Sequence, residues 1–378
     1  MIKEVISRED VKAFLDLPAA LYKNSPHWIR PLNQDIEAVF DPKRNRAFRH
    51  GECTRWLLFD DNGNVIGRVA AFTKNNSGGM GFFECVNDRA AAFKLFDQCK
   101  SWLQQRGMEF MDGPINFGDR NSWWGLLLDG FHLDPNYQSN YHLPYYKELF
   151  EAYGFQVYFY QYTFGRKIMG PLNERLWEKA RMVEGNKDYT FRYLRKSEID
   201  KMPGMIKHVY NKAWASRGEI PALTEAQAKN IVRQMKPILD EKLLWFGFYK
   251  EEPVIFFLSL PEVNQIFKYL DGNLNWLGKI KFLWYRFRKV NRKAFGILFG
   301  IVPEHQGKGL DGAIIMHFRK LMQEDYHRYD EYEMNWIGDF NPQMIRIAEQ
   351  INTEIWKTHA TYRYLFDRTK PFERMSFV

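Results

Sequence analysis

The segment that most constrains the fold is an apolar run at residues 294–302, which is followed at once by a glycine-rich loop. The run reads Ala-Phe-Gly-Ile-Leu-Phe-Gly-Ile-Val and contains no charged or polar side chain. A short run without a polar face is typical of a central strand that is buried on both faces of a sheet. The run therefore predicts a central strand, and together with the strands and helices on either side of it in the sequence it indicates an α/β fold in which a mixed (α+β type) central sheet is flanked by helices.

The loop at residues 302–312 reads Val-Pro-Glu-His-Gln-Gly-Lys-Gly-Leu-Asp-Gly and leads into a predicted helix over 310–323. Its glycines let the backbone curl, so that successive N–H groups and the helix N-terminus face one point. Such a concavity binds phosphate. Lys308 adds a positive charge at its rim. Taken alone, these residues fit an ordinary strand-to-helix turn equally well.

The rest of the chain reads as two similar successions of strands and helices. Strands at 54–59, 64–73 and 81–86 precede a long helix in the first half, and strands at 243–249, 254–260 and 294–302 precede the helix at 310–323 in the second. A chain of 378 residues is also too long for one ordinary core. We predict a tandem duplication with domains at 1–170 and 171–378. Only Asn87 and Asp88 separate the third strand from the helix in the first domain, so that domain lacks a phosphate loop.

Charge and cysteine content narrow the function classes. Residues 1–170 contain 20 Lys and Arg against 20 Asp and Glu, and the remaining residues contain 34 against 26. An anionic partner is therefore expected in the second half. Three widely spaced cysteines without a CxxC pair predict no disulfide and no metal site. No apolar stretch approaches about 18 residues and no signal peptide is present, so a soluble cytoplasmic protein is expected.

The loop and the order of elements resemble the GNAT superfamily of N-acetyltransferases, and more narrowly its tandem members. The family motif reads V-x-P-x-x-(Q/R)-G-x-G-x-(G/A), and residues 301–311 are compatible with it everywhere except position 311. The resemblance implies an acyl-CoA-dependent N-acyltransferase that uses acetyl-CoA as donor and a small-molecule or peptide amine as acceptor. It places the cofactor on the strand residues Phe299, Ile301 and Val302, on the loop residues Gln306, Gly307, Lys308, Gly309, Leu310, Asp311 and Gly312, and on Asn341.

Amine acylation needs a base for the ammonium proton and a donor for the departing thiolate. Glu333, on the predicted strand 332–337, is our first candidate for the base, ahead of Glu304 and His305, and a structural role stays open for each. The strand N–H near Ile301 would polarise the thioester carbonyl.

Two positions depart from the family. Asp311 replaces the usual Gly or Ala, and it either repels the pyrophosphate or points away as an early helix residue. Ala348 stands where many members have the tyrosine that protonates the thiolate. Tyr332 and Tyr364 are possible replacements.

Two other functions stay open. The chain is alternatively a GNAT-like protein that binds CoA or another phosphate ligand without turnover, as Asp311 and Ala348 favour. Ranked third is a nucleic-acid or membrane-surface binder that uses residues 279–293, which hold seven bases and no acid among several aromatics. We favour the interpretation of 279–293 as an amphipathic helix that covers the sheet with its aromatic side chains inward. Acceptor identity and oligomeric state do not follow from the sequence.

Overall fold

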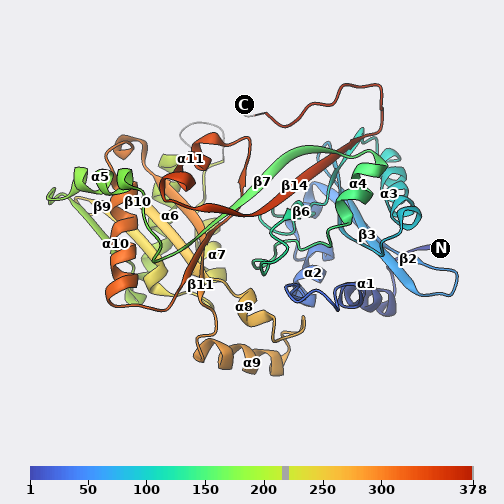
Figure 1. The fold of residues 1–378 in the computed structure, drawn as a ribbon, viewed down its shortest axis with the longest axis horizontal. Helices are drawn as coiled ribbons and strands as arrows, with labels where there is room; N and C mark the ends of the chain where they lie inside the picture. The colour runs from blue at the N-terminus through green and yellow to red at the C-terminus, as the bar shows by residue number, and fades with distance from the viewer. Residues whose placement is uncertain (215–220, 377–378) are drawn as a thin grey trace.

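The computed structural model describes residues 1–214 and 221–376 of the chain. The remaining residues, 215–220 and 377–378, fall within the second predicted domain and lie outside the described residues. The molecule is elongated, with the two halves of the chain side by side (Figure 1). One sheet of 14 strands runs through both halves of the described chain.

The first half follows the predicted order of elements. Asp88 begins the long helix α3 by accepting a hydrogen bond from the Ala91 amide, and Gly63 lies in the turn between β2 and β3 with a φ of 80°. The elements are β1 (Ile2–Glu4), α1 (Arg8–Leu21), α2 (Asn33–Phe40), η1 (Arg46–Arg49), β2 (Gly51–Phe59), β3 (Val65–Lys74), β4 (Ser77–Cys85), α3 (Arg89–Gln104), β5 (Phe110–Gly113), β6 (Leu126–Asp129), α4 (Tyr146–Tyr153) and β7 (Gln156–Lys167).

The second half repeats this order with an insertion between its third and fourth strands. Its elements are α5 (Glu174–Val183), β8 (Tyr189–Tyr193), η2 (Lys196–Lys201), α6 (Met202–Ala213), α7 (Glu225–Met235), η4 (Glu241–Leu243), β9 (Leu244–Tyr249), β10 (Glu252–Pro261), α8 (Asn264–Phe267), α9 (Trp276–Phe287), β11 (Lys293–Ile301), η5 (Pro303–His305), α10 (Leu310–Glu324), β12 (Glu331–Met334), β13 (Ile337–Gly338), α11 (Pro342–Gln350) and β14 (Glu354–Leu365).

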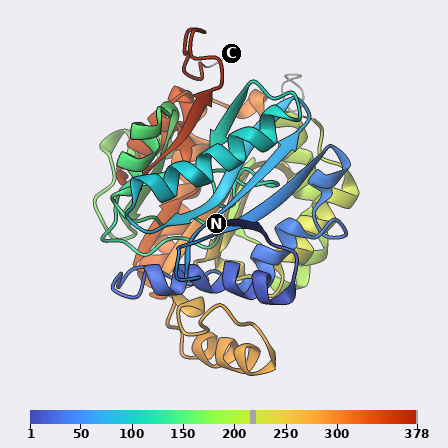
Figure 2. The same cartoon turned by 90° about the vertical axis from the view of Figure 1, so that its right-hand side faces the viewer.

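Helices cover both faces of the sheet, so the predicted mixed sheet flanked by helices is confirmed. In the first half α3 and α4 pack on one face and α1 and α2 on the other (Figure 2). In the second half α10 packs on one face and α6 on the other. None of the helices in the described part of the chain is long and apolar enough to cross a membrane.

The two halves exchange strands across their junction. Strand β14 pairs with β7 along most of its length and, through residues 362–365, with β5 of the first half. Strand β7 in turn pairs with β12 and β13 of the second half. The sheet order is therefore β1-β2-β3-β4-β5-β14-β7-β12-β11-β10-β9-β8. The predicted boundary at residue 170 falls between β7 and α5 and stays a prediction, because the sheet continues across it.

Helix α9 corrects the expectation for residues 279–293. The helix is amphipathic, but it lies beyond the sheet at the extremity of the molecule and not over it (Figure 2). Of the aromatic side chains on this helix, only Phe282 and Tyr285 face the protein, against Phe267 and Tyr269, and the expectation that the aromatic side chains all point inward is wrong. The short helix α8 offers α9 too narrow a contact to bury more than one edge of it.

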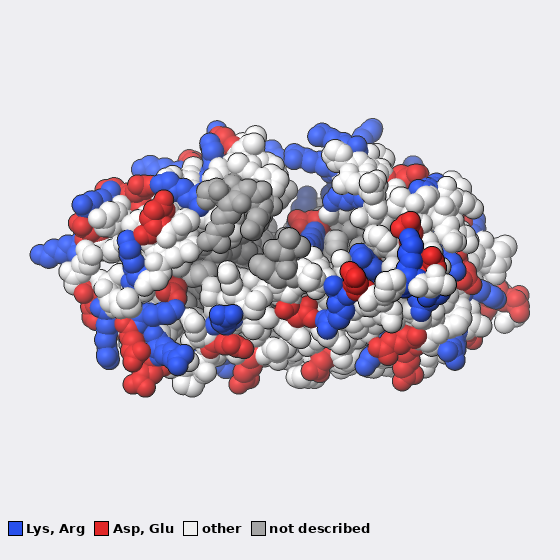
Figure 3. All heavy atoms as spheres, turned by 90° about the horizontal axis from the view of Figure 1, so that it is seen from above, with Lys and Arg blue, Asp and Glu red and all other residues white. Residues whose placement is uncertain are grey.

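Lys and Arg are distributed evenly among Asp and Glu on the upper face of the molecule (Figure 3). The described residues of this face therefore form no patch of one sign of charge, although the second half of the sequence has the excess of bases.

Candidate active site

The apolar run forms β11, and the two strands beside it, β10 and β12, diverge midway along its length. Antiparallel β10 accompanies β11 to Ile301, whereas parallel β12 pairs only as far as Gly296 and Met334. Beyond that point the chain turns away, so that β13 pairs with β7. The predicted central strand is confirmed, since it has strands on both sides. Five of its nine residues are only partly buried, because β12 leaves one edge of it open.

The backbone N–H of Ile301 faces this open edge. Val302 donates its N–H to the carbonyl oxygen of Val254 in β10 over 2.9 Å. In an antiparallel ladder successive residues direct their N–H groups to opposite sides. The N–H groups of Phe299 and Ile301 therefore point away from β10, toward the gap that β12 leaves. This is the direction that the predicted oxyanion role of Ile301 requires.

The glycine-rich loop turns into α10 through two residues in the left-handed region. Gly307 has a φ of 72° and Gly309, the residue before α10, has a φ of 86°. Both conformations strain any residue with a Cβ. An added Cβ at Gly307 would meet no heavy atom within 4 Å, so this side of the loop is open. Gln306 and Lys308, beside it, are exposed as well.

Helix α5 covers the other side of the loop. An added Cβ at Gly309 would lie 2.0 Å from the carbonyl oxygen of Lys179, and one at Gly312 would lie 2.6 Å from that of Leu176. The Lys179 ammonium donates to Asp311 and also to Gln350 at the end of α11, each over 2.6 Å. Gly309 and Gly312 thus permit a close helix contact. Asp311 points to a lysine of α5, in agreement with the view that it turns away from the loop concavity.

The predicted acyl donor fits this loop only in part. Gln306, Gly307 and Lys308 are accessible, and a pyrophosphate on that side would meet one free positive side chain. Leu310 and Val302 are buried in the core. The face made by Gly309 and Gly312 is filled by α5 in this conformation.

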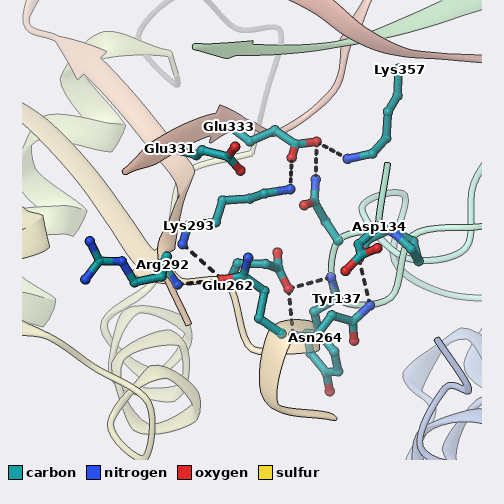
Figure 4. Close-up of polar contacts among 12 residues, drawn as sticks. Asp134, Tyr137, Glu262, Asn264, Arg292, Lys293, Glu331, Glu333 and Lys357 are labelled. Atoms are coloured by element: carbon teal, nitrogen blue, oxygen red, sulfur yellow. Dashed lines mark hydrogen bonds and ion pairs between the residues drawn. The ribbon is translucent and has the colours of Figure 1, made fainter. Parts of the chain in front are cut away.

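A buried polar cluster lies where the two halves meet, and we define it as Asn136, Glu262, Lys293, Glu333 and Lys357 (Figure 4). Glu333 of β12 is fully buried, and its carboxylate accepts from Lys293 of β11 and Lys357 of β14, each over 2.5 Å. The amide of Asn136 donates to the same carboxylate over 2.6 Å. The cluster joins strands β11, β12 and β14 of the sheet to a loop of the first half.

Charge neighbours set the protonation of this cluster. Burial alone would raise the pKa of Glu333, but Lys357 and Lys293 hold that pKa below its ordinary value. Burial lowers the pKa of Lys357, and the adjacent Lys293 charge lowers it further against the attraction of Glu333. For Lys293 the glutamates outweigh burial and its pKa is raised. Glu333 is thus a carboxylate engaged by three donors, which weakens the case for it as a free base.

Glu262 has the opposite shift. It follows β10, is buried, and accepts hydrogen bonds from the backbone amides of Tyr137 and Asn264 over 2.9 Å and 2.8 Å. Burial raises the pKa of Glu262 to about 7, and the negative charge of Glu333 adds to the shift. A carboxyl group that titrates near neutrality is suited to proton transfer at physiological pH.

A small cavity, which we call the tryptophan cavity, lies beside the cluster and opens where β12 leaves β11. Both halves line it, with Asn121, Trp123, Trp124, Asn136, Gln138, Ser139, Gln161 and Thr163 from the first and Phe295, Asn335, Trp336 and His359 from the second. The indole N–H groups of Trp123, Trp124 and Trp336 are buried and have no hydrogen-bond partner among the described residues. Three such donors suit a ligand that brings oxygen acceptors.

His359 lines the same cavity as a neutral imidazole. Its Nε2 lies 3.1 Å from the carbonyl oxygen of Asn140, which only accepts, so Nε2 holds the proton. Burial lowers the pKa of His359 to about 4.

Other predicted residues lie elsewhere. Asn341 caps α11 by accepting from the Met344 amide, and His305 contacts the Tyr189 hydroxyl beside the loop. Tyr332 is buried on the face of β12 that packs against α10, and burial raises its pKa. Tyr364 belongs to the core of the first half, away from the splayed strands.

Ala348 occupies a tight site. It is fully buried against Phe164 and Ile337, so a tyrosine ring at this position would displace one of them.

Local sequence patterns do not indicate most of the cluster. Lys293 belongs by composition to the basic insertion, and no motif marks Asn136, Glu262 or Lys357. Lys357, His359 and Thr361 occupy every second position of the strand at 354–365, and all three are buried. This alternation of polar residues is the one sequence pattern that could have indicated a polar site on one face of the strand. No group of His, Cys, Asp and Glu within the described ranges is placed to hold a metal ion.

Comparison with known proteins supplies relatives and a fold. No protein-family model matches the chain. It is 26% identical to the bacterial ceramide synthase of Caulobacter vibrioides, over 93% of this chain and 94% of that protein. It is 23% identical to protein YghO of Escherichia coli, over 96% and 94% of the two chains.

Two solved structures share its architecture. A tandem GNAT protein from the clavulanic acid biosynthesis pathway superposes with a TM-score of 0.54 and 10% identity, over 99% of both chains. A GCN5-related glucosamine N-acetyltransferase region of a fungal multi-domain GH3 β-N-acetylglucosaminidase gives a TM-score of 0.54 at 10% identity. In that pair the match covers 96% of this chain but only 38% of the fungal one.

Proposed function

The chain has the fold of the tandem GNAT proteins, and from this premise we propose that it is an acyl-CoA-dependent N-acyltransferase. The observation that supports the proposal best is the tryptophan cavity at the point where β12 leaves β11. An open strand edge with outward N–H groups provides a place for a thioester, and the polar cavity of about 20 Å³ next to it has room for the amino group of an acceptor. Residues of both halves line this cavity, so the first half takes part in the proposed site.

The proposed reaction depends mainly on positioning. The donor's acyl arm would lie along the open edge of β11, where the N–H of Ile301 donates to the thioester carbonyl and stabilises the negative charge that develops there. The amine would enter the tryptophan cavity and attack the carbonyl carbon of the thioester, the carbon–sulfur bond would break, and CoA would leave as the thiol with the proton that the amine loses. Two reactants held in this way react as if at a very high local concentration. The open side of the loop at Gln306, Gly307 and Lys308 would hold the donor's phosphates.

Two carboxylates compete for the role of base. Our sequence-based candidate Glu333 lies in the cluster, but three donors already engage it. Glu262 has a pKa of about 7 and, within the described part of the chain, accepts hydrogen bonds only from backbone amides. The pH–rate profile separates them: the limb near pH 7 disappears in Glu262→Gln if Glu262 takes the proton. If the limb near pH 7 is still present in Glu262→Gln, and the fall in rate toward acidic pH is lost in Glu333→Gln, the base is Glu333.

For the acceptor we propose an amine with a long hydrocarbon chain. The support is the name of the Caulobacter relative, which makes ceramide, a fatty amide. Acetyl transfer to a small-molecule or peptide amine is the alternative that the sequence suggested. A panel of amines tested with acetyl-CoA and long-chain acyl-CoA decides between them by thiol release.

A binding protein without turnover is the second candidate. The observation that favours it is a shortage of catalytic groups, since three donors engage Glu333 and the buried site of Ala348 has no room for a tyrosine. Thermal shifts with CoA and acyl-CoA test both candidates together, since failure of every ligand to raise the melting temperature contradicts both. If the ligands bind but no amine of the panel causes thiol release, the protein is a binding protein without turnover.

The cavity itself is tested by Trp336→Phe, which keeps one aromatic ring and removes the five-membered ring with its unpartnered N–H. We expect a higher KM for the amine with an unchanged thermal shift by acyl-CoA. The matched control is Trp177→Phe on α5, an exposed indole far along the chain from the cavity. Equal effects of the two substitutions would show that the cavity does not hold the amine.

A further inference from the structure

Helix α9 presents an apolar face to solvent. Six large hydrophobic side chains on it are between 50% and 78% exposed, namely Trp276, Leu277, Ile280, Leu283, Trp284 and Phe287. At about 100° per residue they fall on one arc of roughly 120°. Exposed apolar residues scattered singly are ordinary, but a contiguous stripe of this kind marks an interaction surface.

Bases flank this stripe on both sides. Lys279 lies next to one edge of the arc, and Lys281 and Arg288 lie next to the other. All three are exposed and, among the described residues, none has an ion-pair partner. The sequence from 272 to 303 contains no Asp or Glu. This differs from the upper face of the molecule, where acids and bases mix (Figure 3).

The opposite edge of α9 fixes the helix to the protein. Phe282 packs on Phe267 of α8, and the rings of Tyr285 and Tyr269 stack with centroids 4.1 Å apart. Asn275 caps the helix by accepting from the Gly278 amide. The stripe is therefore held facing outward, at the extremity that Figure 2 shows below the body of the molecule. Contact with a flat surface needs no movement of the helix.

The insertion that holds α9 starts and ends in the polar cluster. Glu262 precedes α8 and Lys293 follows α9, and the Glu262 amide donates to the Lys293 carbonyl oxygen over 2.9 Å. The side chain of Gln265 closes the same neck by accepting from the amides of Arg292 and Lys293. A partner on α9 is thus connected to the candidate active site by two short segments of chain.

We propose that α9 docks this protein on the surface of an anionic phospholipid bilayer. Aliphatic side chains such as Leu283 and Ile280 favour the boundary between lipid headgroups and acyl chains. They provide no aromatic ring on which a nucleobase could stack, which argues against nucleic acid. Trp276 and Trp284 are suited to the interface, and the flanking bases reach lipid phosphates with their apolar stems lying along the boundary. The proposal depends on these observations alone and not on the proposed acyl transfer.

Flotation of the full-length protein with vesicles tests this proposal. The probe is a vesicle of one part phosphatidylglycerol to three parts phosphatidylethanolamine, compared with pure phosphatidylcholine. We expect binding to the anionic vesicle that weakens with added salt, and a loss of at least about tenfold in Leu283→Asp with Phe287→Asp. Lys279→Glu with Lys281→Glu should lose about tenfold on anionic vesicles. Met182→Asp, an equally exposed apolar residue on α5, is the control and should bind as wild type.

The contrary results are distinct. Absence of vesicle binding, or equal binding by wild type and the Leu283→Asp, Phe287→Asp variant, overturns the proposal. So does tight binding to a single-stranded oligonucleotide without vesicle binding. A dimer that sedimentation detects in wild type and that this variant dissociates, with no vesicle binding by either, assigns the stripe to a second copy of the chain and also overturns it. Because none of these readouts uses turnover, failure of the acyltransferase proposal leaves the result intact.

Discussion

Among single residues, Glu262 and Glu333 show how one buried cluster shifts two carboxyl groups in opposite directions. Glu333 faces two ammonium groups, and their charges outweigh its loss of hydration. Glu262 meets backbone amides and lies near the negative Glu333, so the loss of hydration dominates. Shifts of opposite sign are typical of sites that move protons, although ion-pair networks with a structural role produce them too.

Glu262→Gln should change how stability depends on pH. The pKa of Glu262 is raised from 4.5 to about 7 in the folded protein, so its ionisation opposes folding increasingly as pH rises between these values. The expected slope is about 1.4 kcal/mol per pH unit. The variant should therefore gain stability relative to wild type across this window and hold a constant advantage above it. Urea unfolding at several pH values measures the difference, and a difference independent of pH would contradict the assignment.

Glu333→Gln should have the opposite sign. It leaves two buried lysines without their counter-charge, and we expect a loss of about 3 kcal/mol at neutral pH. Because the pKa of Glu333 is held below its ordinary value of 4.5, this loss should shrink as pH falls below that value. Glu331→Gln on the same strand, which removes a partly exposed pair with Lys167, should cost less than about 1 kcal/mol. Equal losses in the two variants would argue against a buried charge at Glu333.

At the scale of elements, the contact of α5 with α10 explains why glycine stands at positions 309 and 312, which the phosphate-loop motif alone does not explain. Gly309 and Gly312 lie three residues apart on the face that meets the backbone of α5, where a Cβ has no room. Gly307 has a similar left-handed conformation but faces open space. The same motif thus serves helix packing on one side and keeps an accessible concavity on the other.

Gly309→Ala and Gly307→Ala separate these two demands. Both place a Cβ at positive φ, which costs on the order of 1 kcal/mol. Only Gly309→Ala also places a methyl group against the Lys179 carbonyl oxygen. It should therefore destabilise the protein by about 1 kcal/mol more than Gly307→Ala does. Denaturant midpoints measure both. Losses of the same size would mean that α5 does not pack on the loop in solution.

For the whole molecule, strand exchange joins the two predicted domains through one sheet. Tyr362 of β14 is fully buried in the core of the first half, although it belongs to the second half of the sequence. Strand β7 is likewise shared, since it pairs with β14, β12 and β13. Neither half completes its sheet without a strand from the other.

The full chain should accordingly unfold in a single calorimetric transition. Tyr362→Ala should remove about 3 kcal/mol or more and lower the protection of amides in α3 and α10 alike. Ile355→Ala, at a half-exposed position of the same strand, should change stability little. Two resolved transitions, or a Tyr362→Ala effect confined to α3, would show that the halves fold independently.

The sequence alone determined the features that depend on neighbouring residues. An apolar run, a hairpin turn with glycine, a capped helix and a glycine-rich loop each result from preferences within a few positions, and so β11, the β2–β3 turn, α3 and the loop before α10 were predictable. The repeated order of these elements was also sufficient to predict the tandem fold.

Only the tertiary structure decided what depends on residues far apart in the chain. The polar cluster draws on positions from 136 to 357, and no local pattern links Asn136 to Glu333. The cover of α5 over the loop, the exchange of β7 and β14, and the outward face of α9 likewise depend on which surfaces meet. Local preferences determine which element forms, whereas burial and the pairing of charges across the fold determine what that element contacts.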